Sequence, residues 1–178
     1  MEKISFSPKY DYKDYELWEG NWELISGTAY AMTPLPTFKH QNISQKIAQQ
    51  LGNLLSDCKK CIPLLPMDWK VSDDTILQPD NCVICYPIND EDRYLTSPPT
   101  LIFEILSPST ATKDKILKYH IYQEQKVKYY VIVNPKSNLS DVFELKNDEY
   151  EKILVAKNET FNFELGDCKI DFDFSFIW

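Results

Sequence analysis

The sequence predicts an α/β protein in which a mixed central β-sheet is flanked by helices, with a hairpin near each end. Three observations predict this fold. Along the chain, the order is hairpin, helix, strands, helix, strand and hairpin, which is typical of a sheet covered by helices. Residues 101–106 (LIFEIL) and 128–133 (KYYVIV) are largely apolar, as expected of buried strands. Residues 38–58 repeat apolar side chains at the spacing of an amphipathic helix.

The composition is that of a globular protein. The 178 residues suffice for one domain with its own core, and we expect residues 1–178 to form it. No apolar run approaches the roughly 20 residues of a membrane span, and the polar start lacks a signal peptide. A cytoplasmic location without a membrane partner is therefore expected. The net charge of −8 argues against binding polyanions over the whole surface. The lysine-rich residues 109–130 suit a local anionic contact, although a solvated helix face is the simpler interpretation.

The first third of the chain predicts a hairpin followed by the helix. Residues 22–32 (WELISGTAYAM) contain two short strand patterns joined at Ser26-Gly27. Glu23 alternates with apolar neighbours there, so we expect it on the solvent side or as a hydrogen-bonded carboxylate. His40 falls at the start of the helix, on the edge of its apolar stripe. Residues 1–14 are expected to form a flexible N-terminal arm.

The remaining elements follow from apolar runs and turn residues. Further strands are predicted over residues 67–71, around Pro79-Asp80, over 101–106 and over 128–133, with a loop over 89–99. A second helix over 111–125 begins after Ser109 or Thr110, either of which suits an N-cap. The last segments are a hairpin over 141–156 that turns at Asn147-Asp148, and an apolar tail over 161–178 that we expect to close the edge of the sheet.

Four of the five cysteines form two Cys-x-x-Cys pairs, Cys58 with Cys61 and Cys82 with Cys85. Such pairs are typical of zinc ribbons. Residues three apart on a strand point to opposite faces, however, so Cys82 and Cys85 could not bind one ion. Cys58 and Cys61 follow a helical pattern, and reduced cysteines are common in cores. We therefore expect core cysteines without zinc, and no disulfide in a reducing cytoplasm.

Two acidic residues stand on apolar strands, Asp80 after Pro79 and Glu104 within LIFEIL. Chains rarely bury an unpaired carboxylate, so Glu104 needs a partner. A Mg²⁺ or Mn²⁺ ion shared by the two acids would neutralise it, because hard divalent cations bind carboxylate oxygens. Metal-assisted phosphodiester cleavage also needs a cation near the developing charge, and lysine commonly supplies it.

The position expected for that lysine, two residues after Glu104 on the same face, holds Leu106. The following helix offers Lys118 instead. Asp114, Lys118 and Tyr122 recur at intervals of four, so they share one helix face near the end of the Glu104 strand. An ordinary ion pair on a helix surface is the structural alternative.

These motifs together resemble the Uma family of restriction-endonuclease-like proteins. The motifs are, in order, WELISGTAYAM, His40, QPD before VIC, FEILSPST, Asp114-x3-Lys118-x3-Tyr122 and VKYYVIVNP. The resemblance runs from about Tyr15 to the C-terminus and implies a PD-(D/E)XK nuclease-like core. It implies that Asp80 and Glu104 are metal ligands. The family is similar in lacking the lysine after the glutamate, and Lys118 looks like its replacement.

The resulting hypothesis is a Mg²⁺- or Mn²⁺-dependent endonuclease acting on DNA. Asp80, Glu104 and the backbone carbonyl of Ile105 would bind the metal, and Lys118 would complete the catalytic set. Further residues would act in catalysis or support the site: His40, Asp114, Tyr122 and Glu23. A double-strand cut would suggest a homodimer.

Two other functions compete with this hypothesis. One is a catalytically inactive module on the same fold, which binds nucleic acid or a protein partner because the usual lysine is absent. The other is an interaction domain stabilised by zinc at Cys58, Cys61, Cys82 and Cys85, which the strand geometry disfavours.

Overall fold

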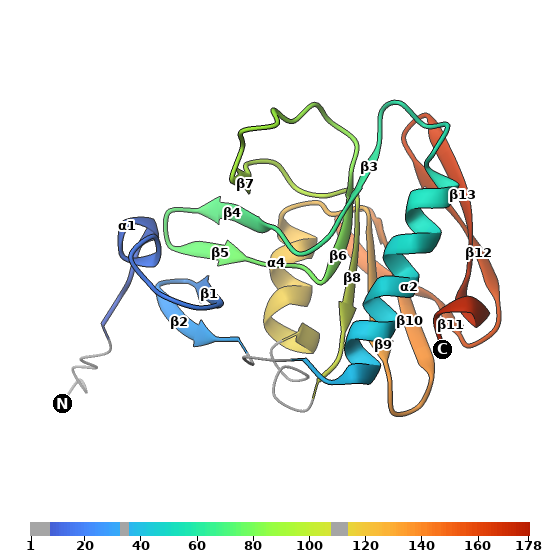
Figure 1. Cartoon of the computed structure of the whole chain (residues 1–178), viewed down its shortest axis with the longest axis horizontal. Coiled ribbons are helices and arrows are strands. Elements are labelled where there is room, and N and C mark those ends of the chain that lie inside the picture. Colours follow the sequence, from blue (N-terminus) through green and yellow to red (C-terminus); the bar gives the residue numbers. More distant parts are fainter. Residues whose placement is uncertain (1–7, 33–35, 108–113) are drawn as a thin grey trace.

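The structure is a computed structural model that describes residues 8–32, 36–107 and 114–178, except for the side chains of residues 114 and 115. At its centre lies a six-stranded sheet in the order β11-β10-β9-β8-β6-β3 (Figure 1). Its strands are β3 (Ile62–Leu64), β6 (Asn81–Ile84), β8 (Leu101–Ile105), β9 (Tyr129–Asn134), β10 (Leu139–Lys146) and β11 (Glu149–Ala156). Only the β8–β9 pair within it is parallel, so the sheet is mixed, as predicted.

Helix α2 (Phe38–Leu54) covers one face of this sheet (Figure 1). It begins at the N-cap Thr37, whose Oγ1 accepts a hydrogen bond from the backbone N–H of His40 at 3.3 Å. It ends four residues before the predicted boundary at residue 58. Its inward stripe is buried against the sheet and consists of Ile43, Ile47 and Leu51. Neither α2 nor any other helix in the described part of the chain has the length and apolar character to cross a membrane.

A second layer covers the opposite face. It is a five-stranded sheet in the order β2-β1-β5-β4-β7. Its strands are β1 (Trp22–Ile25), β2 (Thr28–Ala31), β4 (Asp68–Ser72), β5 (Thr75–Leu77) and β7 (Tyr94–Leu95). Two consecutive helical elements, η1 (Asp114–Lys118) and α4 (Tyr119–Glu124), lie beside this second sheet (Figure 1). Trp69 of β4 stacks on Tyr122 of α4 with ring centroids 5.8 Å apart, and Tyr130 of β9 packs edge-on against the same tyrosine.

Both predicted hairpin turns form at the predicted residues. Ser26 and Gly27 have φ angles of 49° and 78°, and Asn147 and Asp148 have 49° and 69°. Two consecutive left-handed residues form the type I′ turn, whose twist matches that of the flanking strands. Gly27 is also packed closely, because a Cβ there would lie 3.3 Å from the Cβ of Lys9.

Two other predictions for the strands were wrong. The tail over 161–178 does not close the edge of the central sheet. Strands β12 (Thr160–Leu165) and β13 (Cys168–Asp173) instead pair only with each other, and they cover the same face as α2 (Figure 1). Their alternating apolar residues need a face to cover, which a position at the edge would not provide. The predicted loop over 89–99 contains β7, which pairs in parallel with β4.

The N-terminal segment is not a flexible arm over its described part. Helix α1 (Tyr12–Tyr15) has a complete capping box at its start. The backbone N–H of Tyr10 donates to the carbonyl of Gly27 at 2.9 Å, so the segment is bound to the β1–β2 turn. Residues 1–7 lie outside the described residues.

The prediction that no disulfide forms was also wrong. Cys58 pairs with Cys168, and Cys61 pairs with Cys85. Cys58 and Cys61 lie in the loop between α2 and β3 rather than on a helix. The register of β3 and β6 sets Cys61 opposite Cys85, and the β12–β13 hairpin brings the distant Cys168 to the same place. Cys82 is buried and unpaired.

Phe103 tests the layer between the central sheet and the C-terminal hairpin. It is fully buried, and its ring lies 5.0 Å from that of Phe172 and 6.2 Å from that of Phe163. We expect Phe103→Ala to lower the free energy of unfolding by about 3–5 kcal/mol, because truncation leaves a cavity. Chemical denaturation measures the loss. The control is Phe176→Ala, at an exposed ring, and equal losses for both variants would contradict this packing.

Candidate active site

The two predicted metal ligands lie opposite each other, Glu104 on β8 and Asp80 immediately before the adjacent strand β6. Glu104 lies on β8 and is 2% exposed. Strand β6 pairs antiparallel with β8 and sets Asn81 opposite Phe103, so Asp80, one residue earlier, falls opposite Glu104. The backbone N–H of Ile105 donates to Oδ2 of Asp80 at 2.8 Å. The sheet register therefore brings both carboxylates to one place.

Lys118 lies between two buried carboxylates. Its Nζ is 2.8 Å from Oε1 of Glu104 and 2.8 Å from Oε1 of Glu23. All three side chains are almost fully buried. The backbone N–H of Gln78 donates a further hydrogen bond to Oε1 of Glu23 at 2.9 Å. Glu23 is therefore a satisfied buried carboxylate, and the alternative expectation that it faces solvent was wrong.

Tyr122 also binds Glu104. Its hydroxyl donates to Oε1 at 2.6 Å, the same oxygen that Lys118 contacts. Complete burial, followed by the negative charge of Glu104, raises the pKa of Tyr122 well above its usual value. The hydroxyl therefore keeps its proton and acts as a fixed donor to the carboxylate.

The helix that carries Lys118 and Tyr122 is not a regular α-helix throughout. Segment η1 is a π-helix, and α4 follows it directly. Such π-turns are frequent at functional sites, and they change which residues share a face. Lys118 and Tyr122 nevertheless both reach Glu104. The side chain of Asp114 and the predicted N-cap residues Ser109 and Thr110 lie outside what the structure describes.

His40 lies at the solvent-facing side of the site. Its Nε2 is 3.4 Å from Oδ2 of Asp80, and both side chains are partly exposed, at 15% and 18%. The N-terminal turn of α2 positions the imidazole. Asp80 and His40 are thus open to solvent, whereas Glu104 and Lys118 lie beneath them in the interior.

A layer of polar residues behind the site was not predicted. Gln78 binds Glu23 through its backbone N–H, and its side-chain Nε2 donates to Oδ1 of Asp68 at 3.0 Å. The hydroxyl of Tyr15 donates to Oδ2 of Asp68 at 2.9 Å. Burial raises the pKa of Asp68. The sequence indicated this layer only weakly, because Asp68 begins the short strand β4, Gln78 follows the short strand β5, and no motif surrounds either residue.

A cleft of about 310 Å³ opens beside this polar layer. Its lining includes the charged residues Glu16, Asp68 and Arg93. Five of its eleven lining residues are aromatic, namely Tyr12, Tyr15, Trp18, Trp22 and Tyr94. Aromatic side chains suit a flat group such as a base, because every base presents a π-face.

Comparisons with known proteins give the family and the fold of this chain. The Uma2 family model, described as "Putative restriction endonuclease", matches residues 11–166. The chain belongs to the Uma2 family. Among solved structures, it is similar to "a putative nuclease belonging to DUF820 from Anabaena variabilis", with a TM-score of 0.76 and 14% identity. That similarity covers 94% of this chain and 96% of the other. No curated protein matches the chain.

The Uma2 match confirms the family resemblance, and the structural similarity confirms the nuclease-like fold class. At this low identity, the solved structure supports the fold alone. The geometry brings together Glu23, Glu104, Lys118 and Tyr122, and it sets Asp80 and His40 beside them. The catalytic and metal-binding roles of these residues stay predictions.

Removal of Lys118 tests the buried charge cluster. We expect Lys118→Met to lower the free energy of unfolding of this Uma2 protein by about 3–5 kcal/mol, because it leaves two buried carboxylates without this cation. Lys169→Met is the matched control, since Lys169 forms an ion pair with Glu164 on the exposed surface and its loss has little effect. Urea titration of both variants gives the comparison. A similar loss in the two would show that Lys118 is not held as described.

Proposed function

We propose that this Uma2 protein is a metal-dependent endonuclease that hydrolyses phosphodiester bonds of DNA. One observation carries the proposal: Asp80, just before β6, lies opposite Glu104 of β8, and the ammonium of Lys118 lies 2.8 Å from Glu104. Two carboxylates with a nearby cation form the set that metal-assisted phosphodiester cleavage requires. The family description supports the same class of reaction.

The residues present fit Mg²⁺ or Mn²⁺. Hard divalent cations take oxygen ligands, commonly one or two carboxylates with water and substrate phosphate. Asp80, Glu104 and the backbone carbonyl of Ile105 would hold the ion. A bound ion would supply a nucleophilic water and neutralise charge on the phosphate.

Lys118 would stabilise the negative charge that develops on the phosphate or orient the attacking water. Its two carboxylate partners fix its position before substrate arrives, so little reorganisation is needed during the reaction. Glu23 acts through Lys118, and Tyr122 acts through Glu104; both are therefore positioning residues. His40, beside Asp80 at the solvent side, would contact the substrate or accept a proton.

The competing function is a catalytically inactive binding module. It is favoured by Leu106, which stands where the strand lysine of related nucleases is expected. The two functions differ in one observable. A nuclease needs the metal for turnover, whereas an inactive module binds DNA or a partner equally well with and without a chelator.

Plasmid cleavage tests the proposal. We expect wild type to nick or cut plasmid DNA with Mg²⁺ or Mn²⁺, and Asp80→Asn and Glu104→Gln each to lower the rate by roughly a hundredfold or more. Asp73→Asn, at an exposed acid on a turn, should leave the rate unchanged. Circular dichroism confirms that each variant is folded. Cleavage that survives both site substitutions, or that persists in chelator, rules out this mechanism.

A further inference from the structure

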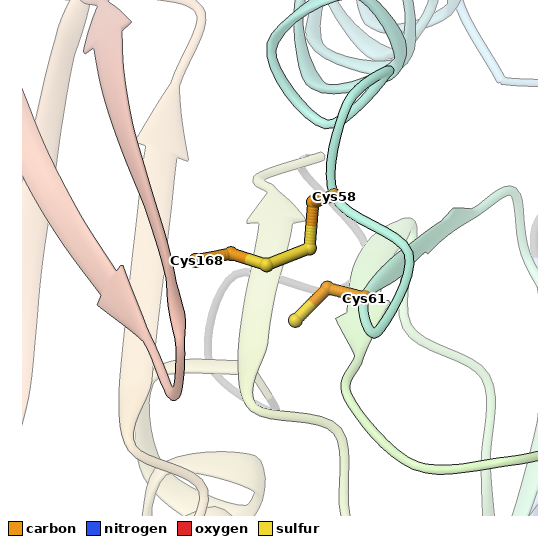
Figure 2. Close-up of side chains that lie close together, drawn as sticks. All are labelled: Cys58, Cys61 and Cys168. Atoms are coloured by element: carbon orange, nitrogen blue, oxygen red, sulfur yellow. A yellow bond between two sulfur atoms is a disulfide. The ribbon is translucent and has the colours of Figure 1, made fainter.

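The two disulfides lie against each other rather than in separate parts of the fold. The sulfurs of Cys58, Cys61 and Cys168 all lie within 4.8 Å of one another. Figure 2 shows the sulfur of Cys61 turned toward the Cys58–Cys168 bond. The fourth sulfur, of Cys85, is bonded to that of Cys61 at 2.05 Å. Cys58, Cys61, Cys85 and Cys168 together form what we call the cysteine cluster.

The spacing of the cysteine cluster is close to that of a zinc site. Four thiolates at about 2.3 Å from a tetrahedral Zn²⁺ lie roughly 3.8 Å from one another. Three of the four sulfurs already lie within 4.8 Å of one another, and the fourth, of Cys85, is bonded to that of Cys61. Once both S–S bonds open, rotation of the Cys85 side chain would bring the fourth sulfur toward the other three.

The structure assigns to the reduced cysteine cluster a binding site for one Zn²⁺ ion, held by four thiolates. This site differs from the one that the two Cys-x-x-Cys pairs suggest. Cys82 lies on the other face of β6 and belongs to the other core, as the alternation of the strand predicts. Cys168, from the distant C-terminal hairpin, takes its place.

The local backbone supports zinc binding. Cys58-Lys-Lys-Cys61 lies in the turn between α2 and β3, where both sulfurs can face one ion, as in zinc knuckles. Cys85 follows the end of β6, and Cys168 begins β13. A closed set of four protein ligands is the signature of a structural rather than a catalytic zinc site.

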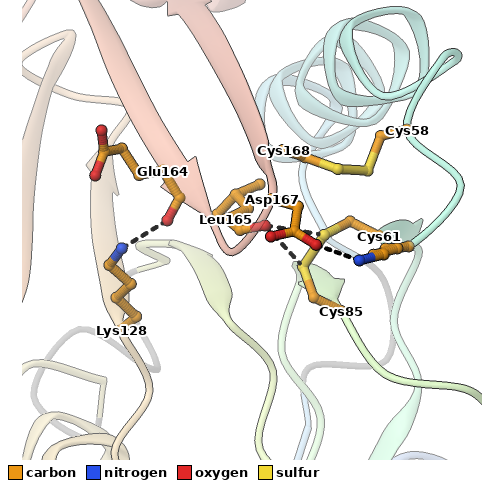
Figure 3. The surroundings of a disulfide bond; sticks show 9 residues. Cys58, Cys61, Cys85, Lys128, Glu164, Leu165, Asp167 and Cys168 are labelled. Carbon is orange, nitrogen blue, oxygen red and sulfur yellow. Dashed lines mark hydrogen bonds and ion pairs between the residues drawn. A yellow bond between two sulfur atoms is a disulfide. The ribbon is translucent and has the colours of Figure 1, made fainter.

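A backbone carbonyl and an exposed ion pair lie beside the cysteine cluster. The backbone carbonyl of Leu165 lies 3.3 Å from the sulfur of Cys61 and 3.8 Å from that of Cys85 (Figure 3). A reduced Cys61 could donate its thiol hydrogen there. Lys60 and Asp167 pair with each other, so together they add no net charge at the edge of the cluster. Cys58 and Cys168 are partly exposed, so an ion has a path to the site.

The disulfide form and the zinc-bound form of the cysteine cluster interconvert by reduction followed by metal binding. Two molecules of a dithiol reductant supply four electrons and four protons, which convert the two disulfides into four thiols, and each reductant becomes a disulfide. Binding of Zn²⁺ then releases four protons and leaves a tetrathiolate site with a net charge of −2. Two molecules of a disulfide oxidant reverse the exchange, because they take up the four electrons together with four protons and become dithiols, while the two protein disulfides form again and release the ion.

The cysteine cluster is independent of the proposed active site. It joins the loop after α2, the end of β6 and the tip of the C-terminal hairpin. Helix α2 separates it from His40, and 17 helical residues span on the order of 25 Å. Zinc binding can therefore be measured without any nuclease assay, and failure of one proposal leaves the other intact.

Cobalt titration of the reduced protein tests the zinc site. We expect reduced wild type to bind about one Co²⁺ per chain, with the visible and sulfur-to-metal charge-transfer absorption of a tetrahedral thiolate site, and Zn²⁺ to displace it. The matched variants are Cys168→Ala, which removes a ligand, and Cys82→Ala, which removes the cysteine outside the cluster. Cys82 is buried in the core on the other side of the sheet, so its sulfur does not compete for the ion.

Cys82→Ala should bind cobalt as wild type does, whereas Cys168→Ala should lose roughly tenfold or more in affinity together with the thiolate spectrum. Elemental analysis of the reduced, zinc-loaded wild type gives the stoichiometry independently of any variant. Circular dichroism shows whether Cys168→Ala is folded. If reduced wild type shows no thiolate spectrum and retains no zinc, or if both variants bind equally, the assignment is wrong.

Discussion

The ion pairs of Lys118 are the interaction on which the rest of the candidate site depends. Each charge loses several kcal/mol of hydration when it is buried, and only close partners repay that loss. Lys118 finds them in Glu23 and Glu104, which come from two different sheets. The ammonium therefore fixes the position of the β1–β2 hairpin against β8. A protein without this cation would have to expose the carboxylates, and the two layers would separate there.

The same interaction explains how a lysine reaches Glu104 although Leu106 stands two residues after it, where a lysine was expected. Leu106 is partly buried and packs against the core between the two sheets. The side chain at this position therefore contributes to the core and not to the charge of the site. Lys118 enters from the following helix instead, and the π-helical segment η1 immediately precedes α4 at that point. The cation reaches the glutamate from a different element, and its place in the site is set by charge rather than by its position on the strand.

Many of the helices, strands and turns were predictable from the sequence, because they depend on residues that are close together along the chain. Apolar runs gave the strands around Glu104, and Ser26-Gly27 and Asn147-Asp148 gave the turns. The site was predictable only in part. The pairing of Asp80 with Glu104 follows from strand register, and the family motifs pointed to Lys118. The partner of Glu23 and the pairing of Cys168, which is 110 residues from Cys58, depend on tertiary packing that no local pattern encodes.

Strand β6 runs between the candidate active site and the cysteine cluster. Asp80 precedes it and lies opposite Glu104, whereas Cys85 follows it and belongs to the cysteine cluster. A slip of one residue in a strand reverses the face of every side chain, so both ends require the same register. Cys61 lies opposite Cys85 in the β3–β6 register, so whatever joins these two cysteines, a disulfide or an ion, also joins β3 to the far end of β6. Asp80 is held separately, by the hydrogen bond from the backbone N–H of Ile105, so the two sites share a strand but not their stabilising contacts.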